Sequence, residues 1–216
     1  MYLSRVILDL SNRASLAVAA DAYEAHRFVF AAYVDAKAAR PLYRVEAGLG
    51  GIAVIAQGLV EPDWERALRL SGARATVESK QIMKPRFDNG TRYRFKLVAN
   101  AVKTIADAHG KTDGQGKPKS VRVPLIRDDQ LRAWLDGQGK KAGFIVERAT
   151  VEKREPIVAR NGRAGNDIRL AATGFNGTIF VSDGDALWDA IGRGFGHGKG
   201  FGLGLLSVAP AVEGTV

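Results

Sequence analysis

The sequence contains no cysteine among its 216 residues, which excludes disulfide bonds, thiolate metal ligands and cysteine nucleophiles. It has only three histidines, so a zinc site would have to rely on carboxylates. No apolar run approaches the roughly 18 residues that indicate a membrane span, and the N-terminus lacks a signal-peptide pattern. We therefore expect a cytoplasmic protein that has no membrane partner, no structural metal and no cofactor.

Positive charge is concentrated in the second part of the chain. The chain has 32 Lys and Arg against 23 Asp and Glu, a formal net charge of +9. Residues 1–80 hold ten basic and nine acidic side chains, whereas residues 81–216 hold 22 and 14. This distribution favours a polyanionic partner, with a merely solvated basic surface as the alternative. Nucleic acid is favoured over a membrane because the basic residues lie mostly in predicted strands and loops, not on an amphipathic helix.

Hydrophobic spacing predicts two units with the same order of elements. In the first unit, we expect strands at residues 2–10, 43–47, 52–57 and 75–83, and helices at 19–37 and 63–72. In the second, we expect strands at residues 92–98, 143–154, 167–181 and 203–208, and helices around 131–135 and at 183–191. The fold class is therefore α+β, with two tandem ferredoxin-like (RRM-like) βαββαβ domains, residues 1–85 and 90–216. The aromatic signature of RNA-recognition modules is absent.

A glycine-rich segment lies between the last predicted helix and the last predicted strand. Residues 192–204 carry glycine at every second position. We expect Gly196, Gly198 and Gly200 to let the backbone approach phosphates closely, and Lys199 to add charge. The segment matches neither the dinucleotide fingerprint nor a P-loop, which removes NAD and ATP as favoured cofactors. A flexible linker is the alternative interpretation.

Tyr23 and His26 are three residues apart on a predicted helix, so they share a face near its N-terminal end. The helix dipole favours a phosphate group there. RNA carries its own nucleophile, the 2′-OH, so its cleavage needs only a base, an acid and cations. Histidine can serve as the acid or the base. Alternatively both side chains belong to a buried stripe, because Ala19, Phe30 and Tyr33 continue the same spacing.

A basic hairpin is predicted between the two long strands of the second unit. Asn161-Gly162 is a tight-turn signal, and Arg154, Arg160 and Arg163 lie around it. We expect this arm to grip an RNA stem, because arginine binds phosphates and guanine edges; a solvated basic hairpin is the alternative. The other residues expected to bind RNA by their charge are Arg27, Lys103, Lys119 and Lys199.

Four stretches of the sequence carry a resemblance to a known family. They are residues 1–6, 94–100 with 103–104, 120–126 ahead of 133–135, and 194–209. In this order they resemble the CasE-type CRISPR repeat endoribonucleases of type I-E systems. The most specific stretch ends Lys-Gly-Phe-Gly-Leu-Gly-Leu-Leu-Ser-Val-Ala at residues 199–209. One departure is Ala101, where the family usually has proline.

The resemblance implies a metal-independent endoribonuclease that binds the CRISPR repeat hairpin and cuts precursor CRISPR RNA at the 3′ base of the stem. It also implies that the protein keeps the mature guide and works with other Cascade subunits. The family's catalytic histidine lies on the first helix, with a tyrosine one turn before it in some members, and these positions match His26 and Tyr23. Two alternatives stay open, a non-catalytic RNA-binding subunit and a small-molecule enzyme of the same fold. Attack by the 2′-OH predicts a 2′,3′-cyclic phosphate and a 5′-hydroxyl as products.

Overall fold

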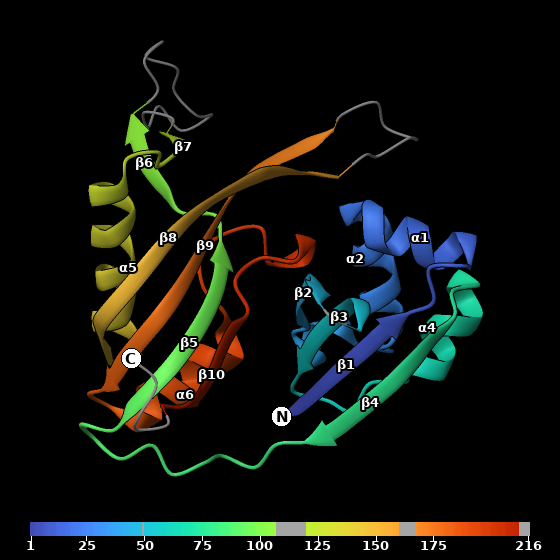
Figure 1. Cartoon of the computed structure of the whole chain (residues 1–216), viewed down its shortest axis with the longest axis horizontal. Coiled ribbons are helices and arrows are strands. Elements are labelled where there is room, and N and C mark those ends of the chain that lie inside the picture. The colour runs from blue at the N-terminus through green and yellow to red at the C-terminus, as the bar shows by residue number, and fades with distance from the viewer. Residues whose placement is uncertain (49, 107–119, 160–166, 212–216) are drawn as a thin grey trace, which may run out of the picture.

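The computed structural model describes residues 1–48, 50–106, 120–159 and 167–211. These residues form two antiparallel sheets of four strands, each with helices against one face, as Figure 1 shows. We call the part up to β4 the N-terminal half and the part from β5 onward the C-terminal half. No helix within these ranges is long and apolar enough to cross a bilayer. The domain boundaries at residues 85 and 90 stay a prediction.

The N-terminal half has the ferredoxin-like topology that its hydrophobic spacing predicts. Its elements are β1 (Tyr2–Leu8), α1 (Arg13–Ala20), α2 (Ala22–Ala31), α3 (Ala36–Ala39), β2 (Leu42–Gly48), β3 (Gly51–Gly58), α4 (Trp64–Ser71) and β4 (Ala75–Gln81). The strand order is β2-β3-β1-β4, and every neighbouring pair is antiparallel. Val6 and Val54 are paired on the two central strands and fully buried, and Phe28 and Trp64 pack into the same core from the helices.

The single helix predicted over residues 19–37 is wrong. Three helices occupy this region, and α2 begins only after Asp21. The backbone of Asp21 is extended, and its carboxylate accepts hydrogen bonds from the amides of Tyr23 and Glu24 at 2.7 and 3.3 Å. An aspartate that bonds to the backbone in this way interrupts one helix and starts the next. Asn12 caps α1 by a similar contact.

The C-terminal half repeats the topology with an inserted hairpin. Its elements are β5 (Arg92–Ala99), β6 (Val102–Ala106), β7 (Ser120–Pro124), α5 (Asp128–Ala142), β8 (Phe144–Ala159), β9 (Ile168–Val181), α6 (Gly184–Arg193), the 3₁₀ helix η1 (Lys199–Phe201) and β10 (Leu206–Pro210). The strand order is β10-β5-β9-β8, while β6 and β7 pair only with each other. Leu97, Leu131, Phe175 and Leu187 lie in the shared core. The two ferredoxin-like units are therefore confirmed.

The last strand is shorter at its start than predicted. It begins at Leu206, and the residues Leu203 and Leu205 lie in the preceding loop although both are buried. Gly204, between them, has φ +85°, a left-handed backbone conformation that cannot continue a strand. Buried leucines at alternating positions around a glycine thus produce the hydrophobic pattern of a strand where the backbone forms a loop.

The long strands β8 and β9 extend beyond the C-terminal sheet as an arm. Their pairing runs from Phe144 with Val181 to Ala159 with Ile168, with irregularities after Val146 and after Arg154. Such bulges increase the twist of a hairpin and turn its direction. The arm therefore leaves its own sheet and points toward α1 and α2 of the N-terminal half (Figure 1).

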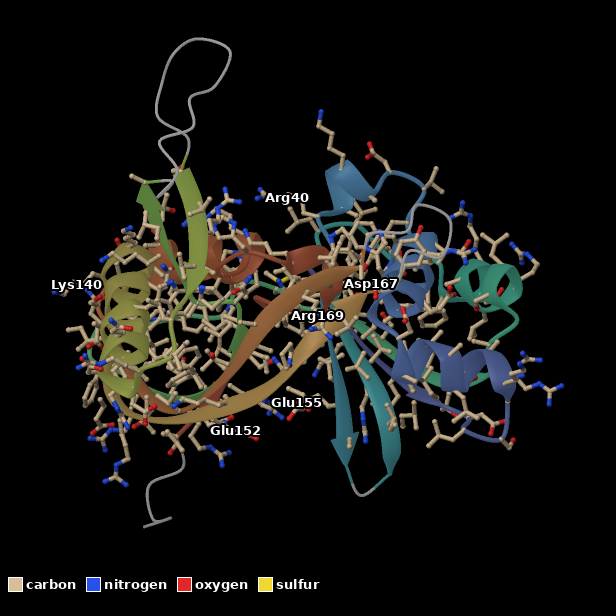
Figure 2. All side chains as sticks on the ribbon, turned by 90° about the horizontal axis from the view of Figure 1, so that it is seen from above. Arg40, Lys140, Glu152, Glu155, Asp167 and Arg169 are labelled. Carbon is tan, nitrogen blue, oxygen red and sulfur yellow. The ribbon has the colours of Figure 1, made fainter. Side chains whose placement is uncertain are left out.

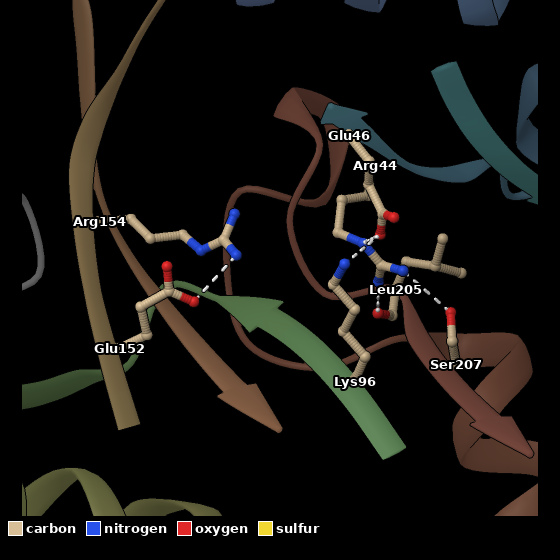
Figure 3. Close-up of polar contacts among 7 residues, drawn as sticks. All are labelled: Arg44, Glu46, Lys96, Glu152, Arg154, Leu205 and Ser207. Carbon is tan, nitrogen blue, oxygen red and sulfur yellow. Dashed lines mark hydrogen bonds and ion pairs between the residues drawn. The ribbon is translucent and has the colours of Figure 1, made fainter. Parts of the chain in front are cut away.

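A buried arginine joins the two halves. Arg44 of β2 donates to the carbonyl oxygen of Leu205 at 2.9 Å and to the hydroxyl of Ser207 at 3.1 Å, and it pairs with Glu46 on its own strand (Figure 3). Lys96 of β5 lies 3.1 Å from the same carboxylate. Burial alone would raise the pKa of Glu46, but the charges and hydrogen bonds of Arg44 and Lys96 outweigh it and lower this pKa. This part of the contact between the halves therefore combines the hydrogen bonds of Arg44 with the ion pair between Lys96 and Glu46.

Replacing Arg44 by alanine should lower the free energy of unfolding by about 3 kcal/mol, because Glu46 stays partly buried without its main partner. Urea unfolding measures this loss. Arg5→Ala is the matched control, since Arg5 lies 3.8 Å from Glu78 at the surface, where a pair contributes at most about 1 kcal/mol. Equal losses in the two variants would contradict a stabilising role for the buried Arg44 contacts between the halves.

Candidate functional site

The candidate site begins on α2, where Tyr23 and His26 lie in the first two turns. This is the second helix of the chain, not the first as predicted. Their rings are stacked with centroids 6.5 Å apart, and both side chains are partly exposed. The buried residues of α2 are Ala25, Phe28 and Val29 instead. The interpretation of Tyr23 and His26 as part of a core stripe is therefore wrong.

The imidazole of His26 is oriented by the C-terminal half. Its Nδ1 lies 2.8 Å from the carbonyl oxygen of Gly200, and its ring packs between Phe30 and Phe201 with centroids 4.1 and 5.5 Å away. A carbonyl oxygen only accepts hydrogen bonds, so Nδ1 carries a proton in this contact. In the neutral ring Nε2 then holds the free lone pair and can accept a proton; in the charged ring it can give one.

The glycine-rich loop packs against the protein through its glycines. Left-handed φ values occur at Gly194, Gly196, Gly198, Gly202 and Gly204. A Cβ on Gly198 would lie 2.7 Å from Leu170, and one on Gly196 would lie 3.1 Å from the carbonyl oxygen of Asn100. The interpretation as a flexible linker is therefore wrong, because the loop is fitted closely to its own half. Its path brings Lys199 and Gly200 to the face of α2.

Three cationic side chains lie near one another around Lys199 of this loop. Burial lowers the pKa of Lys199, and the charges of Arg40 and Arg193 lower it further. Arg40 follows α3 in a left-handed conformation with φ 48°, and Arg193 ends α6. Arg40 lies between the two halves in Figure 2. We call Arg40, Arg193 and Lys199 the cationic cluster. Arg40 was missed from the sequence, because no motif marks it and only the fold brings it to Lys199.

Comparison with known proteins identifies the family. A family model described as CRISPR associated protein matches residues 1–210. The chain belongs to this family. Together with the two relatives described next, this match confirms the resemblance inferred from the four sequence stretches.

Two relatives match the chain over almost its whole length. It is 30% identical over 214 residues to the CRISPR system Cascade subunit CasE of Escherichia coli, covering 97% of this chain and 100% of the relative. It is 32% identical over 228 residues to the CRISPR-associated endoribonuclease Cse3 of Thermus thermophilus, with the same shares covered. A solved structure of Thermus thermophilus Cse3, bound to an RNA representing a pre-cleavage complex, matches with a TM-score of 0.77 and 31% identity over 97% of this chain and 98% of that one.

The remaining residues expected to bind RNA are spread over several surfaces. Arg27 is exposed on α2 and pairs with Glu24 at 3.3 Å. Lys103 is exposed on β6. Arg154 is on the arm and pairs with Glu152 at 3.1 Å (Figure 3). Lys119, Arg160 and Arg163 lie outside the described residues.

A cleft separates the arm from the N-terminal half. Its volume is about 560 Å³, and α1, the start of α2, β2 and the arm line it. Asp21, Arg44, Arg154 and Phe201 are among the residues that face it. Figure 2 shows Asp167 and Arg169 of the arm close to the helices of the N-terminal half. Within the described ranges, no three His, Asp or Glu side chains gather as a metal site would require.

The charge of Lys199 should oppose folding. The lowered pKa means that the ammonium group of Lys199 binds its proton more tightly in the unfolded chain than in the folded one. The loss of folding free energy is therefore complete at pH values below the lowered pKa, and it disappears as the pH rises toward the ordinary pKa of lysine. Lys199→Met keeps the aliphatic stem and removes the charge, so the melting temperature at pH 7 should stay level or rise. Lys140→Met, on the exposed last turn of α5, is the control and should bring no rise. A clear fall for Lys199→Met would refute this account.

Proposed function

We propose that this protein binds the hairpin of a CRISPR repeat RNA and cleaves the precursor RNA at the 3′ base of the stem. The observation that carries the proposal is the 2.8 Å contact between His26 Nδ1 and the Gly200 carbonyl, which leaves Nε2 free for proton transfer. Lys199 of the cationic cluster directly precedes Gly200 on the same loop. One relative is named an endoribonuclease, and a related solved structure holds RNA in a pre-cleavage state. Together these points favour RNA cleavage over small-molecule chemistry.

The chemistry needs no nucleophile from the protein. The 2′-oxygen attacks the adjacent phosphorus, the bond from phosphorus to the 5′-oxygen breaks, and the products are a 2′,3′-cyclic phosphate and a 5′-hydroxyl. One proton leaves the 2′-OH and one is delivered to the departing 5′-oxygen. Nε2 of His26 can perform either transfer. The cationic cluster stabilises the negative charge that accumulates on the phosphorane oxygens.

Tyr23 is better suited to positioning than to proton removal, since phenols are poor bases at neutral pH. Its ring stands beside that of His26 on the exposed face of α2, where a nucleotide can stack on it. Arg27, one residue beyond His26, supplies a further charge for the backbone of the RNA. Tyr23 and Arg27 therefore bind and position the RNA, whereas His26 transfers the proton in the chemical step.

The arm and the loops hold the RNA, and the protein keeps its product. The arm is long enough to lie along a stem, and Arg154 and Arg169 are among its described basic residues near the N-terminal half. A-form grooves exclude most side chains, so the arm acts on the backbone or where the groove opens at a helix end. After cleavage the protein remains with the guide as a subunit of Cascade, the complex for which its Escherichia coli relative is named.

His26→Ala should reduce the cleavage rate by at least about 100-fold and leave hairpin affinity within about tenfold, because it removes proton transfer and little contact surface. Single-turnover cleavage of labelled repeat RNA and a binding titration measure the two effects. His197→Ala, an exposed histidine of the same loop, is the control and should cleave normally. Tyr23→Phe should lose less than His26→Ala. Cleavage by His26→Ala at nearly the wild-type rate would contradict the assignment of His26 as the catalytic residue.

Cleavage should continue undiminished in EDTA, and a single 2′-deoxy sugar at the cut site should stop it, because the 2′-oxygen is the nucleophile. Gel analysis of the product ends measures the chemistry. A requirement for added magnesium in the chemical step, or cleavage of the deoxy substrate, would contradict the mechanism. Tight binding of the natural hairpin without any cleavage would instead indicate a non-catalytic RNA-binding subunit.

Replacing Arg160 and Arg163 together by alanine should weaken stem binding by more than about 1 kcal/mol and flatten its salt dependence, since each lost phosphate contact removes close to one unit of slope. Binding titrations at several salt concentrations measure both. A double alanine variant at Lys140 and Lys141, on the exposed end of α5, removes the same charge far from the arm and should change affinity much less. Unchanged affinity and slope in the arginine variant would exclude the arm as the stem-binding element.

A further inference from the structure

The carbonyl oxygen of Gly200 has a second donor besides His26. The hydroxyl of Tyr43 donates to it at 3.0 Å, and the same hydroxyl lies 3.4 Å from the carbonyl oxygen of Ala22 at the start of α2. Tyr43 belongs to β2 and is almost completely buried. A hydroxyl has one proton, and the shorter contact takes it. The glycine carbonyl is therefore held between a buried phenol and the candidate catalytic imidazole.

We propose that Tyr43 is a positioning residue for His26, acting through the Gly200 carbonyl. Its hydroxyl fixes the direction of that carbonyl, and the carbonyl keeps the proton of the neutral imidazole on Nδ1 and the lone pair on Nε2. The inference deepens the proposed function and rests on it in one respect, since the tautomer affects the rate only if His26 transfers a proton.

The local backbone restrains this carbonyl only through the single turn of η1. Gly200 has no side chain, and Gly198 and Gly202 on either side of η1 adopt left-handed conformations with φ 78° and 82°. Glycine-rich backbone is the most costly to order, so the peptide after Gly200 needs outside contacts to keep one orientation. A Cβ on Gly202 would lie only 3.3 Å from the ring of Tyr43, so the loop passes directly over the phenol. Tyr43 supplies both the surface beneath the loop and the hydrogen bond.

The phenol remains a donor throughout the pH range in which histidine titrates. Burial, and then the charge of Asp21, raise the pKa of Tyr43 far above its ordinary value. Tyr43 therefore takes no part in proton transfer itself. A neutral imidazole can place its proton on either nitrogen, and a fixed acceptor at Nδ1 selects one form. If the carbonyl turns away, the form with the proton on Nε2 gains population, and that form cannot act as a base at Nε2.

Tyr43→Phe removes the hydroxyl and keeps the ring beneath the loop. At saturating protein, the single-turnover cleavage rate should fall about tenfold while the hairpin Kd stays within about twofold, because orientation is lost and contact area is not. In ¹⁵N-labelled protein without RNA, proton–nitrogen correlation spectra above the histidine titration should show His26 with its proton on Nδ1 in the wild type and a mixture in the variant. The His26→Ala spectrum assigns the signal.

Tyr33→Phe is the matched control. Tyr33 is also buried in the N-terminal half, and burial raises its pKa to about 12. Its hydroxyl lies against Gly58, where a Cβ would be 2.6 Å away, not against the loop. Its loss should change neither the cleavage rate nor the tautomer of His26.

The tautomer measurement separates this inference from the proposed function. A wild-type signal with the proton on Nε2, or an unchanged tautomer in Tyr43→Phe, would overturn the positioning role even if cleavage slows. Equal loss of rate in Tyr33→Phe would overturn it as well, by showing a general effect of removing a buried hydroxyl. If the wild type cleaves no repeat RNA, the proposed function fails, and the spectra still decide whether Tyr43 sets the state of His26.

Discussion

The geometry of the site depends on one buried guanidinium. Arg44 connects β2 to the start of β10 through the Leu205 carbonyl and the Ser207 hydroxyl. Sliding the halves past one another would break both hydrogen bonds and leave a buried guanidinium without these partners, which is strongly unfavourable. His26 comes from one half and Gly200 from the other, and their 2.8 Å contact requires that the halves keep a single arrangement. The geometry of the candidate site therefore depends on how the two halves pack against each other.

The loop combines favourable packing with unfavourable charge. Its glycines allow the backbone to pass close to Leu170 and to the ring of Tyr43. The same packing holds Lys199 near Arg40 and Arg193, and burial together with their charges lowers its pKa. Such local conflict is typical of functional sites, which natural proteins keep because the rest of the fold compensates. A polyanionic ligand relieves the conflict by supplying the missing negative charge.

The fold could be predicted from the sequence more fully than the site. Alternating strand patterns gave the correct order of the six ferredoxin-like elements in each half, because these signals are local, but the hairpin of β6 and β7 was not predicted. The helix at residues 19–37 was wrong, since an aspartate can either sit on a helix surface or start a new helix, and spacing does not decide which. Arg40 and Tyr43 could not be predicted as site residues, because they meet the loop only through packing between the halves.

His26 and Gly200 are separated by 174 positions in the chain. During synthesis the N-terminal half leaves the ribosome first, and N-terminal domains generally fold before the rest of a chain is complete. At that stage α2 exists, but the imidazole of His26 has no carbonyl to hold its proton and no neighbouring lysine. A truncated or still growing polypeptide therefore presents its histidine without the partners that orient it. The geometry of the candidate site is therefore complete only after the C-terminal half has been synthesised and has packed against the N-terminal half.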